Sequence, residues 1–144
     1  MFPLATIGYE GDSLTAVIAK LWAASVSLVL DVRAVAASRR PGFSKTTLSA
    51  SLAEAGIDYR HLRALGTPKS GRQATRAGQT NVMRDIYEAH LAEPQAQAEL
   101  TLAAELALHQ PAALLCYEAD AGRCHRAIVA QRLHERIGCE IVDL

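Results

Sequence analysis

The chain has 144 residues, of which 50% are apolar and 21% are charged, which is the balance of an ordinary globular protein. This composition excludes a disordered, collagen-like or low-complexity chain, and the length predicts one domain spanning residues 1–144. Fifteen basic and fifteen acidic residues give a net charge of zero, so no overall field attracts the protein to nucleic acid or to a membrane. We therefore expect the charges that matter for function to be local.

Hydrophobic periodicity predicts strands that alternate with helices along the chain. In chain order we expect a strand at 4–8, a helix from 13 to 22, a strand at 26–32, a helix from 44 to 56, a strand at 57–61, helices from 81 to 91 and from 94 to 110, a strand at 112–117, a helix from 124 to 136 and a strand at 139–142. Asp12 or Ser13 caps the first of these helices, and Ser44 caps the second. Trp22, Met83 and Tyr87 lie at helical spacing and are expected in the core.

Residues 62–80 interrupt this pattern and predict a long loop. Between Arg60 and Thr80 there are five basic residues and no acidic one. Such a segment is most often a solvated surface, but long loops without secondary structure are also typical of lids over functional sites. Placed over a cluster of arginines, this loop would raise the local affinity for a polyanion.

The order of the elements predicts the fold class. Strands that alternate with helices need crossover connections, which produce a mainly parallel sheet with helices on both faces. We therefore expect an α/β protein, a three-layer α/β/α sandwich with a sheet of about five strands.

Polar residues gather where the predicted strands end. Because open parallel sheets bind ligands beyond the carboxyl ends of their strands, these residues are the candidates for a site. Asp31, Glu118, Cys124 and His125 are the candidate catalytic residues, and Tyr9, Arg33, Ser38, Arg39, His61 and Arg126 are the candidate substrate- or anion-binding residues.

The triplet Cys124-His125-Arg126 is expected at the start of the last helix. Free N–H groups and the helix dipole favour an anion there, and Arg126 is suited to bind a phosphate or carboxylate with two hydrogen bonds. The same field would lower the pKa of the Cys124 thiol. The alternative is a capped helix with a buried thiol and a histidine bonded to the backbone.

The acidic candidates also allow two interpretations. Asp31 either orients a base and activates water, or it pairs with Arg33 or Arg39 and shapes the loop. Glu118 is the better candidate for a general base, because it shares a loop with His125.

Several familiar sites are not predicted. The spacing of Cys116, Cys124 and His125 is unlike that of structural zinc sites, even with His61 as a fourth ligand, so we expect no metal. No arginine follows Cys124 or Cys116 at the spacing of the cysteine phosphatase loop. Glycine-rich nucleotide-binding motifs are missing too, so we expect no ATP, NAD or other cofactor.

The cysteines and the start of the chain predict a cytoplasmic protein. No charged, apolar leader precedes the first strand, and no apolar run approaches the roughly 18 residues of a membrane helix. The three cysteines, Cys116, Cys124 and Cys139, are an odd number, which is typical of free, reduced thiols.

A series of short motifs resembles a known family. They are Thr6-Ile7-Gly8-Tyr9, Asp31-Val32-Arg33, Ser38 to Ser44, Gly56-Ile57-x-Tyr59, Leu65-Gly66, and Leu114-Leu115-Cys116-x-Glu118 with Cys124-His125-Arg126. Together, and in this order, they resemble the bacterial and archaeal domain-of-unknown-function family 488. One departure is visible, since Val35-Ala36-Ala37 stands where that family usually has a proline. The resemblance implies a small α/β domain and candidate positions, but no reaction.

Three functions are consistent with these residues. The first is an enzyme that acts on a phosphorylated small molecule, a nucleotide or a nucleic acid. The second is a non-catalytic module that binds a phosphate-bearing ligand or nucleic acid at the same edge. The third is a thiol-based enzyme or redox sensor at Cys124.

Overall fold

Five short strands form one parallel sheet in the computed structural model of the chain, which describes residues 1–144. Their order across the sheet is β3-β2-β4-β1-β5, so every connection between neighbours is a crossover. The strands are β1 (Leu4–Gly8), β2 (Leu28–Asp31), β3 (Asp58–His61), β4 (Ala112–Cys116) and β5 (Ile141–Asp143). The predicted α/β class with a parallel, five-stranded sheet is therefore confirmed.

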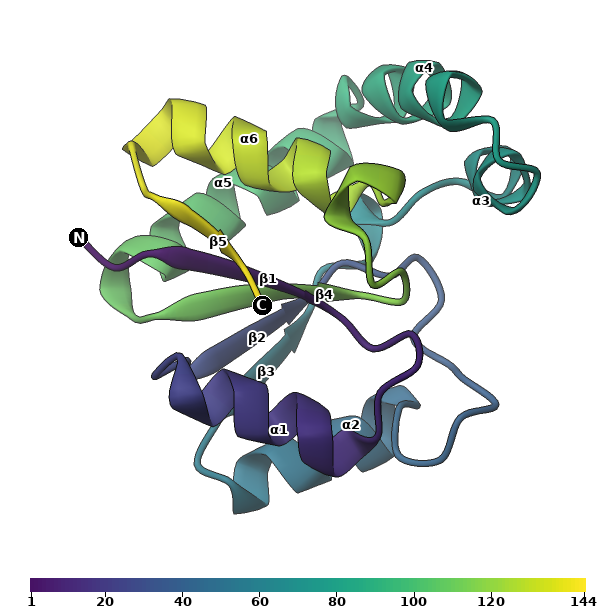
Figure 1. Cartoon of the computed structure of the whole chain (residues 1–144). Coiled ribbons are helices and arrows are strands. Elements are labelled where there is room, and N and C mark those ends of the chain that lie inside the picture. The colour runs from purple at the N-terminus through teal and green to yellow at the C-terminus, as the bar shows by residue number, and fades with distance from the viewer.

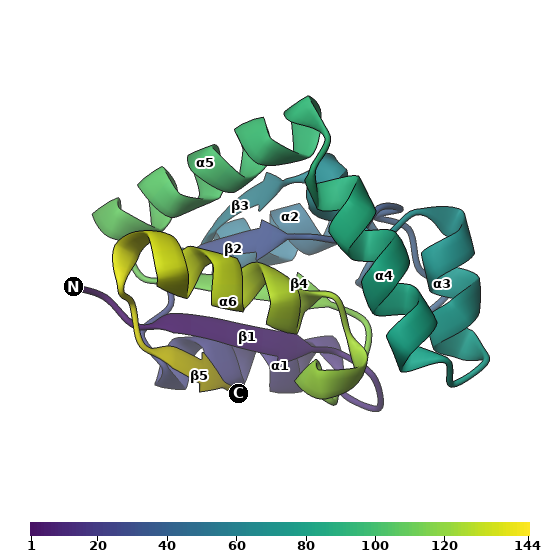
Figure 2. The same ribbon diagram turned by 90° about the horizontal axis from the view of Figure 1, so that it is seen from above.

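Helices cover both faces of this sheet, as Figures 1 and 2 show. The longer helices are α1 (Leu14–Ala23), α2 (Lys45–Glu54), α3 (Lys69–Arg76), α4 (Thr80–Leu91), α5 (Pro94–His109) and α6 (Arg126–Ile137), with single 3-10 turns η1 (Arg63–Leu65) and η2 (Ala121–Arg123). Helices α1 and α2 lie on one face, and α5 and α6 lie on the other, so the three layers expected from the sequence are present.

Successive side chains of each strand point to opposite faces of the sheet, so the hydrophobic core has two parts. Ile7 and Leu115 face α1 and α2, whereas Leu4 and Leu114 face α5 and α6. All of these side chains are buried, because a parallel sheet covered on both faces hides both sides of each strand. This core fixes the carboxyl ends of β1, β2 and β4 side by side at one edge of the sheet.

Most predicted elements are present with small shifts at their ends. The Ser13 hydroxyl accepts a hydrogen bond from the Ala16 N–H, so Ser13 rather than Asp12 caps α1. Ser44 precedes α2 as expected, but its side chain bonds to Ser38 and not to the helix. Gly138 ends α6 in the left-handed conformation with φ of 72°, which glycine adopts without a steric penalty.

The prediction of a loop at residues 62–80 is wrong, because this segment contains η1 and the helix α3. Helix α3 buries only Gly71 and Ala74, so it has no large apolar residues at helical spacing for a periodicity argument to detect. Figure 1 shows α3 and α4 beyond the carboxyl ends of the strands, next to the loops that leave β2 and β4. The basic segment therefore lies at the expected edge, but as an ordered helix.

The expectation that Trp22 lies in the core is also wrong, while Met83 and Tyr87 are buried as predicted. Trp22 is 66% exposed, and its indole N–H donates to the Ala55 carbonyl group, 2.9 Å away. Trp22 follows Leu21 by one residue and is therefore not on the buried side of α1, which carries Val17 and Leu21. None of the helices combines the length and apolar character needed to cross a membrane.

Candidate functional site

A cavity of about 390 Å³ opens at the carboxyl edge of the sheet. It is lined by residues from four separate segments: Tyr9 after β1, Arg33 to Ala37 after β2, Thr67 to Arg76 in and before α3, and Cys116 to His125 after β4. We call this cavity the edge pocket. Of the predicted site residues, Tyr9, Arg33, Glu118, Cys124 and His125 line it.

Asp31 and Arg33 form a buried ion pair beside the edge pocket. The Arg33 Nε and Nη2 groups donate to the two Asp31 carboxylate oxygens at 2.9 and 2.7 Å, and Asp31 is fully buried. The Tyr59 hydroxyl also donates to Asp31. These contacts support the structural interpretation of Asp31, in which it pairs with Arg33 and shapes the loop.

Most N–H groups of the Arg33 guanidinium donate hydrogen bonds to other protein groups. Its Nη1 group donates to the Tyr9 hydroxyl at 3.1 Å and to the Phe43 carbonyl oxygen at 2.8 Å. Burial acts to lower the Arg33 pKa, but Asp31 and Tyr9 outweigh it and raise the pKa above its usual value, which keeps the guanidinium charged. Arg33 therefore gives the pocket wall its shape and a local positive charge.

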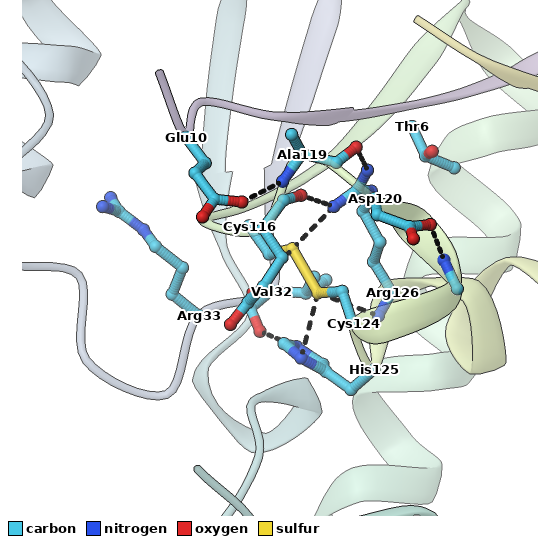
Figure 3. Close-up of a disulfide and its surroundings, with 12 residues drawn as sticks. Thr6, Glu10, Val32, Arg33, Cys116, Ala119, Asp120, Cys124, His125 and Arg126 are labelled. Carbon is cyan, nitrogen blue, oxygen red and sulfur yellow. Dashed lines mark hydrogen bonds between the residues drawn. A yellow bond between two sulfur atoms is a disulfide. The ribbon is translucent and has the colours of Figure 1, made fainter. Parts of the chain in front are cut away.

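Arg126 lies beneath the pocket, with 1% of its surface exposed. Its Nη1 group donates to the Glu118 carbonyl oxygen and to Cys116 Sγ, the latter at 3.0 Å, and Nη2 donates to the Ala119 carbonyl oxygen at 3.1 Å (Figure 3). No carboxylate lies within 4.0 Å of this guanidinium, and its Nε has no hydrogen-bond partner. Arg126 thus holds the loop after β4 from below rather than facing a ligand in the pocket.

Cys116 and Cys124 are joined by a disulfide at the floor of the edge pocket (Figure 3). This corrects the expectation that all three thiols are free; only Cys139 is free, and it is buried. An odd number of cysteines does not reveal that β4 and the loop before α6 bring two of them together. Glu118 is next to the pair, with its Oε2 atom 3.6 Å from Cys116 Sγ.

His125 is buried between the pocket and the helical layer. Its Nε2–H donates to the Val32 carbonyl oxygen at 2.6 Å, and Nδ1 lies 3.5 Å from Cys124 Sγ. The Tyr87 ring packs against it edge-on, with the ring centres 5.1 Å apart. Burial, opposed by the Val32 hydrogen bond and aided by the charge of Arg126, lowers the pKa of His125 to about 4. The imidazole is therefore neutral at physiological pH.

This neutral histidine predicts a loss of stability in mild acid. Because the pKa of His125 is lower in the folded chain than its unfolded value of about 6.5, its contribution is complete above that pH and is lost as the pH falls. We expect about 2 kcal/mol less stability at pH 5 than at pH 7 from this group alone. Urea unfolding at several pH values measures the effect. His125→Gln should flatten the profile, whereas the same change at the exposed His109 should leave it unaltered.

Glu118 presents the carboxyl group that reaches the pocket. Its side chain is partly exposed, and burial raises its pKa above the ordinary value, opposed first by a hydrogen bond with its own backbone and then by the charge of Arg126. The preceding residue, Tyr117, has its side chain on the pocket wall. Of the two acidic candidates, Glu118 lines the edge pocket and Asp31 does not.

Arg72 and Arg76 of α3 line the edge pocket, and sequence reasoning did not single them out. Neither forms an ion pair with a carboxylate, although Arg72 Nη1 donates to the Thr67 carbonyl oxygen at 2.8 Å. The acid-free run from Arg60 to Thr80 was the available indication, but without a predicted helix nothing distinguished these two arginines from the other basic residues.

Besides Arg126, three more predicted anion-binding residues lie outside the pocket lining. Arg39 is exposed on the loop between β2 and α2. The Ser38 hydroxyl accepts a hydrogen bond from the Arg40 N–H, and His61 Nε2 lies 2.7 Å from the Arg33 carbonyl oxygen. Ser38 and His61 therefore have structural hydrogen bonds, and the arginines 33, 39 and 126 do not form one cluster of guanidinium groups facing the pocket.

Comparison with known proteins agrees with the resemblance noted in the sequence. Neither the curated proteins nor the solved structures give a match to this chain. One family model, described as "Domain of unknown function DUF488", matches residues 13–133. The matched region includes α1 to α5, the first part of α6 and most residues of the edge pocket. The chain, matched over most of its length, belongs to the DUF488 family.

Proposed function

We propose that the edge pocket is the active site of an enzyme that acts on a phosphorylated small molecule, a nucleotide or a nucleic acid. The observation that carries this proposal is that Arg72 and Arg76, both without a carboxylate partner, face the same cavity as Glu118 and the cysteine pair. The two arginines on one side of the pocket can bind an anionic ligand, and the carboxyl group and cysteines on the other side can take part in a reaction.

The shape of the surrounding surface supports an extended anionic ligand. A second cavity of about 660 Å³ shares Thr67 and Arg72 with the edge pocket and adds Arg63 and Lys69. Its acidic residue, Glu93, lies 3.7 Å from the His90 ring. A ligand longer than a single phosphate would therefore meet further cations along α3, as a nucleotide or an oligonucleotide requires.

Within the pocket the residues have different roles. Arg72 and Arg76 bind the anion, and Arg33 adds positive potential to the wall. Glu118 is the group placed to accept or donate a proton, because its carboxyl group is accessible from the cavity. Asp31 and Arg126 act as positioning residues, since both are buried and bonded to the loops that form the site.

Anion binding is expected to depend on α3 and not on the loop after β2. Removal of a charge-assisted contact in Arg72→Ala or Arg76→Ala should weaken binding of adenosine monophosphate by about tenfold or more, as measured by calorimetry. The matched control is Arg39→Ala, which removes an arginine outside the pocket and should bind normally. Equal losses in all three variants would contradict the assignment of the edge pocket.

Catalysis and simple binding can be separated at Glu118. Glu118→Gln keeps the size of the side chain and both arginines, so adenosine monophosphate should still bind. If the protein is an enzyme, the variant should lose turnover in a screen of nucleotides and phosphate esters in which the natural chain is active. If no compound is turned over by the natural chain while anions bind through Arg72, the protein is a phosphate-binding module.

A thiol-based activity is the second candidate. The observation that favours it is the position of Cys116 and Cys124 at the floor of the pocket, with the Arg126 N–H 3.5 Å from Cys124 Sγ. After reduction, a reactive Cys124 thiolate should be alkylated by iodoacetamide well below the pH at which an ordinary thiol reacts.

A further inference from the structure

We propose that Cys116, Glu118 and Cys124 bind a divalent zinc-type metal ion when the two thiols are reduced. One ligand atom from each of these residues lies within 4.8 Å of the others. Zinc is bound by thiolate sulfur at about 2.3 Å and by carboxylate oxygen at about 2.0–2.2 Å, so small side-chain rotations bring all three atoms around one ion. We call these three residues the Cys-Glu-Cys cluster.

The backbone spacing of the two cysteines is consistent with an ion between them. Their Cα atoms are 7.5 Å apart, which leaves room for an ion between the two sulfur atoms once the disulfide is reduced. Cys116 is fixed at the end of β4, where it pairs with Gly8, and Cys124 is fixed just before α6. Once reduced, the two sulfur atoms can separate and still converge on one ion.

Arg126 supplies the second, independent observation. A buried guanidinium normally has an anionic partner, but Arg126 has no carboxylate within 4.0 Å and has an unpartnered Nε. Its Nη1 group is directed at Cys116 Sγ, 3.0 Å away. Two thiolates and a carboxylate carry three negative charges; a divalent ion neutralises two of them, and Arg126 offsets the third.

This ligand set differs from the combination of Cys116, Cys124, His125 and His61, whose spacing is unlike that of structural zinc sites. His125 and His61 do not join the cluster, because their Nε2 atoms lie 2.6 and 2.7 Å from the carbonyl oxygens of Val32 and Arg33. Glu118 takes their place, since it lies two residues after Cys116 at the end of the same strand. Three protein ligands with one side open to a cavity is the arrangement of catalytic rather than structural zinc sites.

This inference deepens the proposed function, and it depends on that function only for the use of the ion. The open position faces the edge pocket, where a bound water or a phosphate oxygen of the substrate can occupy it. Glu118 then acts as a metal ligand, and the metal-bound water takes over the proton transfer described above.

Titration with Co²⁺ tests the Cys-Glu-Cys cluster without any substrate. Reduced protein kept without oxygen should bind one equivalent of Co²⁺ and develop thiolate-to-cobalt absorption, which Zn²⁺ then abolishes. Cys116→Ser and Cys124→Ser should lose this absorption, and Glu118→Gln should bind Co²⁺ at least about tenfold more weakly. Cys139→Ser is the matched control and should behave like the natural chain, because Cys139 lies outside the cluster.

Two results would overturn the metal site: no thiolate-to-cobalt absorption in the reduced protein, or the same absorption in both cysteine variants. Circular dichroism shows whether these variants fold, and Glu118→Gln offers a ligand change without the loss of a sulfur. Arg72→Ala separates the two proposals, since it should retain Co²⁺ and lose adenosine monophosphate. If the natural chain binds Co²⁺ but no anion, the proposed function fails and the metal site stands.

Discussion

Asp31→Ala is expected to lower the free energy of unfolding by about 3–5 kcal/mol, because it leaves a guanidinium buried without its charge partner. Arg33 is 6% exposed and Asp31 is fully buried, so water cannot replace the lost carboxylate. The change also removes the acceptor of the Tyr59 hydroxyl. Urea denaturation followed by circular dichroism measures the effect.

Two further variants identify the cause of this loss. Lys20→Ala breaks the exposed ion pair with Asp12 and should cost less than about 1 kcal/mol, since solvent screens that pair. The double variant Asp31→Leu, Arg33→Met should be less destabilised than the sum of its single changes, because neither charge is left unpaired. If Asp31→Ala costs no more than Lys20→Ala, the buried pair does not hold this edge of the sheet together.

The ion pair connects stability to the site. Arg33 bonds to the Tyr9 hydroxyl and to the Phe43 carbonyl oxygen, and the Tyr9 and Phe43 rings stack with centres 4.3 Å apart. Asp31 therefore orients Arg33, and Arg33 fixes one wall of the edge pocket. Asp31 therefore affects a ligand in the edge pocket only through the position of Arg33.

The sequence was sufficient to predict the edge of the sheet at which the edge pocket lies. The order of strands and helices implied a parallel sheet, and the carboxyl-end rule then brought Tyr9, Glu118 and Cys124 together from segments far apart in the chain. Each of these steps depends only on the backbone path. For that reason they agree with the structure even where the ends of individual elements are shifted.

The parts that sequence reasoning missed depend on the directions of side chains. Arg39 and Arg126 are both close to the site in the chain, but one is exposed and the other is buried under the loop that it supports. Arg72 comes from a helix whose buried face has only small residues. The pairing of Cys116 with Cys124 depends on the path of the loop between them, which no periodicity describes.

Gly8→Ala is expected to destabilise the protein by about 3 kcal/mol or more, because a Cβ atom has no space at this position. An ideal Cβ would lie 1.7 Å from the Glu118 carbonyl oxygen and 2.9 Å from Arg126 Nη1. The nearest obstacle is backbone, so a change of side-chain rotamer cannot relieve it. The loop after β4 would have to move away from β1, and Glu118 would move with it.

The same variant should also impair the Cys-Glu-Cys cluster. Displacement of the Glu118 backbone breaks its hydrogen bond from Arg126 and separates the carboxylate from the two sulfur atoms. Folded Gly8→Ala protein should therefore bind Co²⁺ at least about tenfold more weakly than the natural chain. Gly122→Ala is the control within the same loop, since the only contact of an added Cβ within 4 Å is the flexible Asp120 carboxylate at 3.3 Å. Normal stability and normal Co²⁺ binding in Gly8→Ala would mean that the loop has another position available, and the close approach of β1 would then have no part in building the site.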